Sequence, residues 1–322
     1  MSPGPLSCRR LGSSGLMVST VGYGCNSFGV TLPPGDVPDV VAAALDAGVT
    51  LFDTADIYGS RPGESEELLG AALGARREDV VVATKFGMDA HGLNGPDWGA
   101  RGSRRYVRRA VEGSLRRLRT DHIDLYQLHE PDPGTPIEET LTALHELVLE
   151  GKVRYVGCSN FAAWQLVDAD WTARSAGLTP FVSAQNNYSL LARGVEAELV
   201  PAAESLGVGV IPYFPLASGL LTGKYRRGEP APAGTRLARR PERLAAADFD
   251  RLEALTALAD AWGIDLVTLA VGALAAQPGV ASVITGARTA EQIRANVTAA
   301  SWEPTLEQLA AIDAAAPGPA GG

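Results

Sequence analysis

The stretch IDLYQLHEPDPGTPIEETLTALHELVLEGKVRYVGCS, residues 123–159, contains one full unit of the pattern that organises this chain. It begins with a strand-like run at 123–129, passes through a proline-rich turn into a helical stretch, and ends in a second strand-like run at 153–159. Both runs are rich in apolar residues without strict alternation, which is typical of strands covered on both faces of a sheet. The stretch therefore predicts two parallel strands joined by a helix.

The same alternation extends along the chain in both directions. Gly or Pro stands at most junctions, and amphipathic helical stretches separate the strand-like runs. These runs lie at residues 20–24, 49–55, 80–86, 123–129, 153–159, 181–187, 207–214 and 280–286. Eight strands, each followed by a helix, predict one (β/α)8 barrel domain over residues 1–322.

A doubly wound parallel sheet is the alternative fold for such an alternation. That fold is expected to carry a GxGxxG turn after an early strand. The segment GYGCNSFG at 22–29 does not have this spacing. The barrel is therefore the favoured prediction.

Several segments lie outside the repeating pattern. Residues 6–19 carry Gly and Ser around a short turn, which predicts a hairpin that caps the floor of the barrel. Residues 304–315 predict a terminal helix, and 316–322 a loose tail. Two connections, 87–103 and 217–247, are too long for ordinary strand-to-helix links, and loops of that length are usually functional or mobile.

Composition and charge exclude some classes of function. The chain has 322 residues, 46% of them hydrophobic, and a formal net charge of −9. Nucleic acid is not expected as a partner, because binding to phosphate backbones needs a basic face. A small molecule that carries phosphate stays compatible, since a few local Arg and Lys are sufficient for it.

Cysteine content and hydropathy bear on compartment and on metals. Cys8, Cys25 and Cys158 are scattered, and no Cys/His cluster has metal-ligand spacing, so no metal site is predicted. A reduced compartment is the simple inference. The first residues lack the apolar segment of a secretion signal, and no apolar run is long enough to predict a membrane span. We therefore expect a cytoplasmic protein without a membrane partner.

Four polar residues follow or end three successive strand-like runs. Asp53 and Tyr58 lie in LFDTADIYGS, Lys85 lies in VVVATKFG, and His129 lies in IDLYQLHEPDP. The active sites of (β/α)8 barrels lie at the carboxyl ends of the strands. These side chains are therefore expected to meet at one rim of the barrel.

The four residue types suit proton transfer to a carbonyl oxygen. A tyrosine with its usual pKa of about 10 is a poor acid at neutral pH, and an adjacent ammonium is expected to lower that pKa. Lys85 would supply that charge, and Asp53 would hold Lys85 in place. His129 would orient the carbonyl oxygen toward Tyr58, which would donate the proton. His122 and His145 are expected to be structural, and His91 to be exposed.

These segments resemble the aldo-keto reductase family over about residues 6–312. FDTADIYG (52–59), the strand-end Lys85 and YQLHEPDP (126–133) are similar to its catalytic segments. Its cofactor segments are similar to GKVRYVGCSNF (151–161), AQNNYSLL (184–191), PLASGLLTGKY (215–225) and VITGARTAEQIRANV (283–297). The form PLASGLLTGKY resembles the branch that includes bacterial reductases and potassium-channel β subunits. The resemblance implies Tyr58 as proton donor, a tetrad completed by Asp53, Lys85 and His129, and NADP(H) as cofactor.

The resemblance also implies where the cofactor binds. Ser159, Asn160 and Gln185 would hold the nicotinamide amide, and Tyr213 would stack on its ring. Arg288 is expected at the 2′-phosphate, because a guanidinium suits that group. The full set of implied cofactor residues is Gly24, Cys25, Asn26, Asp53, Ser159, Asn160, Gln185, Tyr213, Phe214, Pro215, Leu216, Ala217, Ser218, Lys224, Arg236, Gly286, Arg288, Gln292 and Asn296.

Four positions depart from the family pattern. Cys158 stands where Val is common, and Glu130 follows His129 where Arg or Trp often occurs. Phe214 replaces a common Ser, and Ala295 replaces an acidic residue that contacts adenine. None of these changes falls on the tetrad, so they put adenine contacts and substrate choice in doubt rather than the chemistry.

Three classes of function stay open on the sequence. The favoured one is an NADPH-dependent enzyme that reduces aldehydes or ketones to alcohols, reversibly. The second is a regulatory or redox-sensing protein that binds NADP(H) and turns over slowly, and the third is a non-redox barrel enzyme. The small-molecule carbonyl substrate would depend on the two long loops, with Phe28, Tyr58, Trp98 and His129 as pocket residues. The sequence leaves the oligomeric state open.

Overall fold

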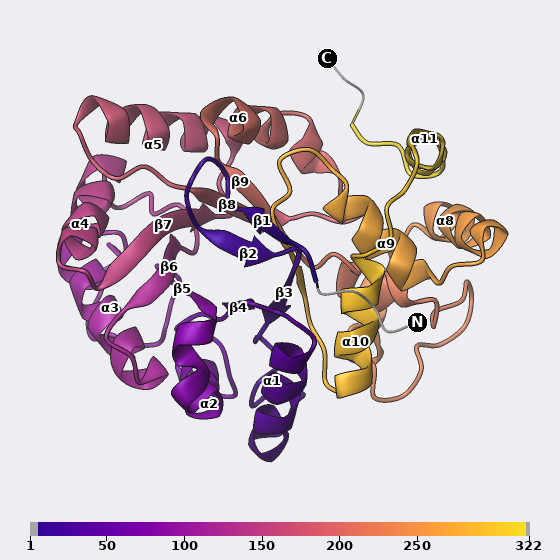
Figure 1. Ribbon diagram of the computed structural model, residues 1–322, viewed down its shortest axis with the longest axis horizontal. Coiled ribbons are helices and arrows are strands. Elements are labelled where there is room, and N and C mark those ends of the chain that lie inside the picture. The colour runs from indigo at the N-terminus through magenta and orange to yellow at the C-terminus, as the bar shows by residue number, and fades with distance from the viewer. Residues whose placement is uncertain (1–5, 320–322) are drawn as a thin grey trace.

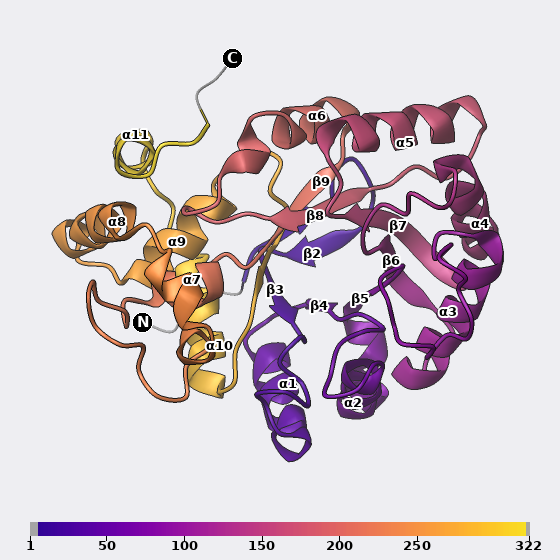
Figure 2. The same ribbon diagram turned by 180° about the vertical axis from the view of Figure 1, so that it is seen from behind.

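The computed structural model describes residues 6–319 and contains the eight-stranded parallel barrel that the sequence predicts (Figures 1 and 2). The sheet order is β10-β3-β4-β5-β6-β7-β8-β9, so neighbours in sequence are neighbours in space. A bridge between Val210 and Val280 brings the last two strands together. The strands are β3 Val21–Gly24, β4 Leu51–Asp53, β5 Val81–Phe86, β6 Ile123–Leu128, β7 Val153–Ser159, β8 Ser183–Asn187, β9 Gly209–Tyr213 and β10 Val283–Thr285.

Helices surround the barrel (Figure 1): each helix from α1 to α6 packs on the next, α9 packs on α10, and α10 packs on α1. The ring helices are α1 Val37–Asp46, α2 Glu64–Leu73, α3 Arg104–Leu118, α4 Ile137–Leu149, α5 Ala163–Ser175, α6 Leu199–Leu206, α9 Leu266–Ala275 and α10 Ala290–Ala299. Side-chain caps fix some of the starts: Asp265 accepts from the Thr268 amide, and Thr289 from the Gln292 amide. Such caps satisfy amide groups that have no partner within the helix.

Three further helices lie outside the ring. They are α7 Pro241–Ala245, α8 Phe249–Trp262 and α11 Leu306–Ala315. The terminal helix α11 packs against α8 and begins at a capping box made by Thr305 and Gln308. The predicted terminal helix at 304–315 is therefore present, and α8 is an additional helix between the seventh and eighth barrel strands.

The hairpin at the start of the described chain closes the floor of the barrel, as the sequence predicts. β1 Cys8–Arg10 pairs antiparallel with β2 Met17–Ser19. Leu11 and Val18 are fully buried, and they pack in one cluster with interior strand residues such as Leu125. Gly12 reaches the barrel so closely that a Cβ on it would lie 2.3 Å from the carbonyl oxygen of Gly207. The amino-terminal end of the barrel is therefore a packed plug.

The long connection at 217–247 is more regular than the sequence suggests. It contains the short helices η4 Ala217–Thr222 and η5 Leu237–Arg239 in addition to α7. Tyr225, Leu237 and Leu244 form a small buried cluster beneath it. The segment therefore carries a small apolar core of its own.

Between residues 6 and 319, no single helix is both long and apolar enough to cross a membrane. The consecutive helices α8 and α9 are long and apolar enough only when they are taken together, and the chain bends by 96° between them. Most of α9 is buried in the protein core.

Candidate active site

Asp53 and Lys85 form a buried ion pair at the carboxyl ends of adjacent parallel strands. Asp53 ends β4, and Lys85 is the penultimate residue of β5. The Lys85 Nζ lies 2.6 Å from Asp53 Oδ2 and donates to the Thr54 carbonyl at 2.9 Å. Lys85 is fully buried and Asp53 is 3% exposed. Charges this deep in a protein need a partner, so the pair fixes the position of both groups.

Tyr58 is carried next to Lys85 by a tight turn at residues 54–58. The Tyr58 amide donates to the Ala55 carbonyl, and the Tyr58 carbonyl accepts from the Ser65 amide at the start of α2. The Lys85 Nζ lies 5.1 Å from the centroid of the Tyr58 ring. The His129 ring meets the Tyr58 ring edge-on, with centroids 5.7 Å apart. The four predicted residues are thus brought to one place at the rim.

The protonation states differ in part from the expectation. Burial raises the pKa of Tyr58 above its usual value, although Lys85 acts to lower it. Burial acts to lower the pKa of Lys85, but Asp53 and Tyr58 outweigh it and the pKa is raised. Burial, assisted by Lys85, lowers the pKa of His129 well below its usual range. At neutral pH the site therefore holds a neutral phenol, an ammonium and a neutral imidazole. The expected lowering of the Tyr58 pKa by Lys85 is outweighed, because burial disfavours the charged phenolate.

Two glutamine side chains complete the surroundings of Asp53. The Gln185 amide on β8 donates to Asp53 Oδ1 at 2.8 Å, and Gln127 on β6 donates to the same oxygen at 3.3 Å. Gln127 was not among the residues predicted from the sequence. The sequence does contain a signal for it, because side chains alternate along a strand and Gln127, two residues before His129, is expected to face the same side. In this structure the Gln185 amide serves Asp53, and its contact with a nicotinamide stays a prediction.

Asn160 connects three strand ends of the rim. Its backbone is left-handed, with φ of 61°, directly after β7. Its side-chain amide donates to the His129 carbonyl at 2.9 Å and to Ser159 Oγ at 3.1 Å. Its oxygen accepts from the Tyr213 hydroxyl at 2.7 Å. These predicted cofactor residues therefore form one hydrogen-bonded group beside the tetrad.

The segment after β9 has an unusual backbone. Phe214, Ala217 and Ser218 have φ of 54°, 47° and 59°, and Gly219 has φ of 99°. Non-glycine residues seldom adopt positive φ, and such residues gather at functional sites. Within the segment, the Ala217 amide donates to the Phe214 carbonyl and the Gly219 amide to the Leu216 carbonyl, so these left-handed residues form tight turns.

Arginine side chains gather near this segment. The Arg236 guanidinium lies 5.4 Å from the Phe214 ring centroid. Burial, assisted by the charges of Arg240 and Arg288, lowers the pKa of Arg236. Lys224 lies over the ring of Tyr225. Arg240 was not among the predicted residues, and its position four residues after Arg236 is the only sequence signal for it.

The loop between β10 and α10 positions the remaining predicted cofactor residues. The Arg288 amide donates to Gln292 Oε1 at 2.8 Å, and Asn296 donates to the Gly286 carbonyl at 3.4 Å. Arg288 and Gln292 are exposed and Asn296 is buried. The loop therefore presents the Arg288 side chain to solvent at the start of a helix.

The first strand contributes backbone rather than reactive groups. Gly24 pairs in register with Asp53, and the Cys25 amide donates to the Asp53 carbonyl. Cys25 is fully buried, and burial raises the pKa of its thiol well above the usual value. Asn26 follows, half-buried. Cys25 is therefore a packing residue with an inert thiol.

The predicted pocket residues outside the tetrad lie in contrasting surroundings. Phe28 is fully buried and its ring packs 5.7 Å from that of Tyr23, which is a core position. Trp98 is 76% exposed and stacks on Arg105, with 4.2 Å between the guanidinium carbon and the ring centroid. The structure gives Phe28 a packing role, and a contact of either residue with substrate stays a prediction.

The fold agrees with comparisons to known proteins. The family model for the aldo/keto reductase family matches residues 20–317. An uncharacterized oxidoreductase, YrpG, of Bacillus subtilis (strain 168) is 39% identical over 97% of this chain and 96% of the relative. The chain belongs to the aldo/keto reductase family.

Other relatives of this aldo/keto reductase carry different names. A probable voltage-gated potassium channel subunit beta of Oryza sativa subsp. japonica is 37% identical over 92% of both chains. A probable aldo-keto reductase 1 of Glycine max is 40% identical over 67% of this chain and 61% of the relative. The likeness to bacterial oxidoreductases and to channel β subunits is therefore confirmed. Membership of the family makes this aldo/keto reductase an oxidoreductase of the carbonyl-reducing type.

Proposed function

We propose that this chain reduces aldehydes or ketones to alcohols with NADPH as the reductant, and that Tyr58 donates the proton. The observation that carries the proposal is the convergence of the Tyr58 phenol, the Lys85 ammonium and the His129 imidazole at one rim, supported by the buried Asp53. This set matches what carbonyl reduction needs from a protein, namely a proton source and donors that stabilise charge on oxygen.

Each residue of the group has a separate role in this proposal. The neutral His129 donates a hydrogen bond to the carbonyl oxygen and aligns it with the Tyr58 hydroxyl. The Tyr58 hydroxyl gives its proton to that oxygen as the alcohol forms. The Lys85 ammonium stabilises the phenolate that is left, which offsets the effect of burial on Tyr58. Asp53 keeps Lys85 charged and in place through the 2.6 Å ion pair.

The residues around the rim fit a nicotinamide dinucleotide. The bound cofactor would supply a hydride to the carbonyl carbon. Asn160, Ser159 and Gln185 offer amide and hydroxyl groups near the tetrad for its nicotinamide end. The tight turns at 214–219 would lie along the pyrophosphate. Arg236, which lies against the Phe214 ring, and the exposed Arg288 would supply positive charge for the phosphates.

The preference for NADPH over NADH is assigned to the arginine group. Burial and the positive charges of Arg240 and Arg288, which repel the Arg236 guanidinium, lower the pKa of Arg236. A dianionic 2′-phosphate would relieve that repulsion and accept charge-assisted hydrogen bonds. NADH lacks this group, so it would leave the repulsion in place.

The test compares the parent protein with Tyr58→Phe. The measured quantity is the rate at which NADPH absorbance decreases when each member of a panel of aldehydes and ketones is added. The variant keeps the ring and removes the proton. We expect turnover to fall by about 100-fold or more, as for loss of a general acid, with the NADPH dissociation constant nearly unchanged. Equal turnover in parent and variant would refute the role of Tyr58.

A second candidate function follows from the relatives named as potassium channel subunits. In this alternative the protein binds NADP(H) and responds to its oxidation state, with slow turnover. Single-turnover oxidation of bound NADPH by added aldehyde separates the two. Oxidation that recurs with every addition of NADPH supports the reductase, and a protein that holds NADPH without oxidising it supports the regulatory role.

A further inference from the structure

Asp56 is a fully buried carboxyl group that the proposed chemistry does not use. It lies in the turn at 54–58, two residues before Tyr58, and its side chain is 0% exposed. Its amide donates to the Lys85 carbonyl at 3.1 Å. Its Oδ2 accepts from the Asn94 side-chain amide at 2.7 Å, whereas Oδ1 has no hydrogen-bond partner among the described residues. A buried acid in this position needs an explanation.

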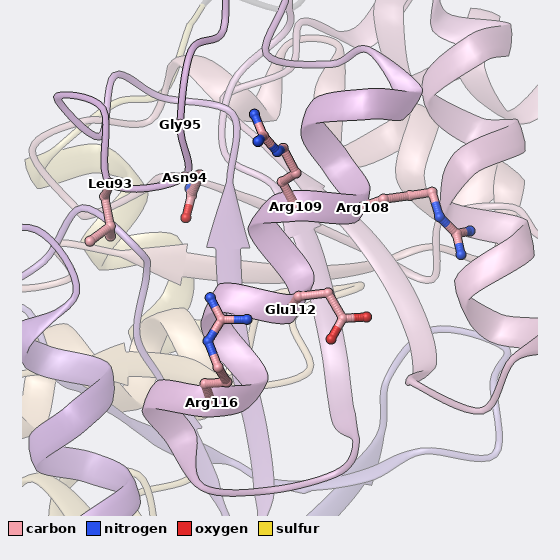
Figure 3. Close-up of a pocket in the computed structure, with 7 residues that line it drawn as sticks. All are labelled: Leu93, Asn94, Gly95, Arg108, Arg109, Glu112 and Arg116. Carbon is pink, nitrogen blue, oxygen red and sulfur yellow. The ribbon is translucent and has the colours of Figure 1, made fainter.

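Asn94 belongs to the long loop at 87–103 and is itself almost fully buried, with 7% of its surface exposed. Its amide also lies 3.3 Å from the Tyr106 hydroxyl of α3. Leu93, Asn94 and Gly95 face α3 across a hollow of about 450 Å³, which Arg109 and Arg116 line from the helix (Figure 3). Asn94 is therefore the point at which this surface loop reaches the interior behind the tetrad.

The bond between Asp56 and Asn94 has a special place in the fold. Among the described residues, it is the only hydrogen bond that joins the turn at 54–58 to the loop at 87–103. The turn is fixed on its other sides by Ala83, Lys85 and Ser65. The loop is fixed at its far end, where the Gly102 amide donates to Asp132. The Asp56 carboxyl thus sets how the loop sits relative to the proton donor.

We propose that Asp56 is a positioning residue, which holds the Tyr58 turn and the substrate-binding loop at 87–103 in a fixed relation through Asn94. The proposal rests on the proposed function, because it takes Tyr58 as the proton donor and the loop as a wall of the carbonyl site. Placement within a fraction of an ångström matters for such groups, since a shift of about 1 Å costs on the order of 100-fold in rate.

The charge state of Asp56 gives the proposal a distinct signature. Burial and the neighbouring Glu66 raise the pKa of Asp56 to about 8. Glu66 is buried, accepts from Thr84 and pairs with Arg117, so an ionised Asp56 would lie near a second buried acidic side chain. The titratable groups that surround Asp56 are Glu66 of α2, Tyr106 and Arg117 of α3, Lys85 of β5 and Tyr126 of β6. The neutral carboxyl is therefore the form that holds the turn at neutral pH.

The test compares Asp56→Asn, Asp56→Ala and Asn94→Ala with the parent protein. Asp56→Asn resembles the neutral carboxyl and still offers an oxygen to Asn94, so we expect parental kcat and KM below pH 8. Above pH 8 the parent is expected to lose kcat/KM as Asp56 ionises, and Asp56→Asn to keep it. Asp56→Ala should lower kcat about tenfold, and Asn94→Ala should raise KM for the carbonyl substrate about tenfold, with NADPH binding unchanged.

The control is Asp79→Asn, which removes an exposed carboxyl paired with Arg76 before β5. It should leave kcat, KM and the pH profile unchanged. A purely structural role of Asp56 would lower Tm in the alanine variants while kcat and KM of the folded protein stayed parental, and that result overturns the proposal. Identical pH profiles of the parent and Asp56→Asn overturn it too, even where Asp56→Ala fails to fold. Parental turnover in Tyr58→Phe would instead refute the role of Tyr58 in the proposed function.

Discussion

At the scale of single residues, the rim depends on how Asp53 is satisfied. Its carboxylate accepts from Lys85, Gln127 and Gln185, which stand on three different strands. A buried ion pair adds little net stability, because desolvation offsets most of the Coulomb attraction. Its value here is positional, since one acceptor fixes the side chains of β5, β6 and β8 against one another.

Asp56 also predicts how stability depends on pH. Its pKa is about 8 in the folded protein against a usual value of 3.8, so the folded state holds a proton that the unfolded state releases. The stabilisation is complete below about pH 4 and is lost as pH rises through about 8. The Asp56→Asn side chain does not titrate. The free energy of unfolding of this variant, relative to that of the parent, should therefore rise across this range by about a few kcal/mol.

Denaturant unfolding of both proteins between pH 5 and 9 measures that difference, and other titrating groups cancel in the comparison. A difference that stays constant across the range would show that Asp56 is ionised in the folded protein at all these pH values. A lowered pKa in the folded protein would give the same constant difference, because Asp56 would then be ionised in both states above pH 5.

There is a physical reason why some site residues could be predicted from the sequence and others could not. Asp53, Lys85 and His129 could be predicted because each ends or follows an apolar strand, and strand ends share one rim. Gln127 and Arg240 were missed because their roles depend on the neighbours that the barrel supplies. The raised pKa of Tyr58 was missed for the same reason, since burial cannot be read from residue types alone.

At the scale of elements, the number, order and direction of the strands follow from the sequence, whereas their lengths do not. The run 49–55 predicts a strand, but β4 covers only Leu51–Asp53, because the chain turns out to the rim after Asp53. The run 280–286 likewise contains a strand of only Val283–Thr285. Apolar runs predict burial, and hydrogen bonding to a neighbour decides where the strand stops.

The hairpin offers a test at this scale through Gly12→Ala. Gly12 has φ of 59°, and a Cβ there would meet backbone atoms of Gly207 and Gly209 at 2.3 and 2.7 Å. Strain and overlap together should destabilise the protein by about 2–3 kcal/mol. Thermal unfolding of Gly12→Ala measures the loss.

Gly151→Ala is the matched control for that substitution. Gly151 also has positive φ, of 74°, but no atom lies within 4 Å of its Cβ position. It should cost only the backbone strain, about 1 kcal/mol. Equal losses in the two variants would mean that the hairpin does not plug the floor tightly.

At the scale of the whole molecule, a net charge of −9 contrasts with the cationic group at one side of the rim. The overall charge repels an anionic cofactor at long range, so local arginines must supply the attraction. Arg288→Ala should weaken NADPH binding about tenfold or more, as for loss of a charge-assisted hydrogen bond, and NADH binding much less.

Titration of both cofactors at low and high salt measures this prediction. Salt screens exposed charges, so the advantage of NADPH over NADH in the parent should shrink as salt rises, and in Arg288→Ala it should be small throughout. Equal weakening of NADPH and NADH in the variant would place Arg288 away from the 2′-phosphate.

The plug at the barrel floor also bears on the order in which the chain can fold during synthesis. The Ser13 amide donates to the Gly207 carbonyl, and Arg9 donates to the carbonyls of Ala275 and Val280. β3 likewise pairs with β10. Arg9 and β3 leave the ribosome long before Ala275, Val280 and β10, so they must wait for these later residues before they reach their partners. Sealing of the floor is expected to be a late, post-translational event, and the nascent hairpin an exposed site for chaperones until then.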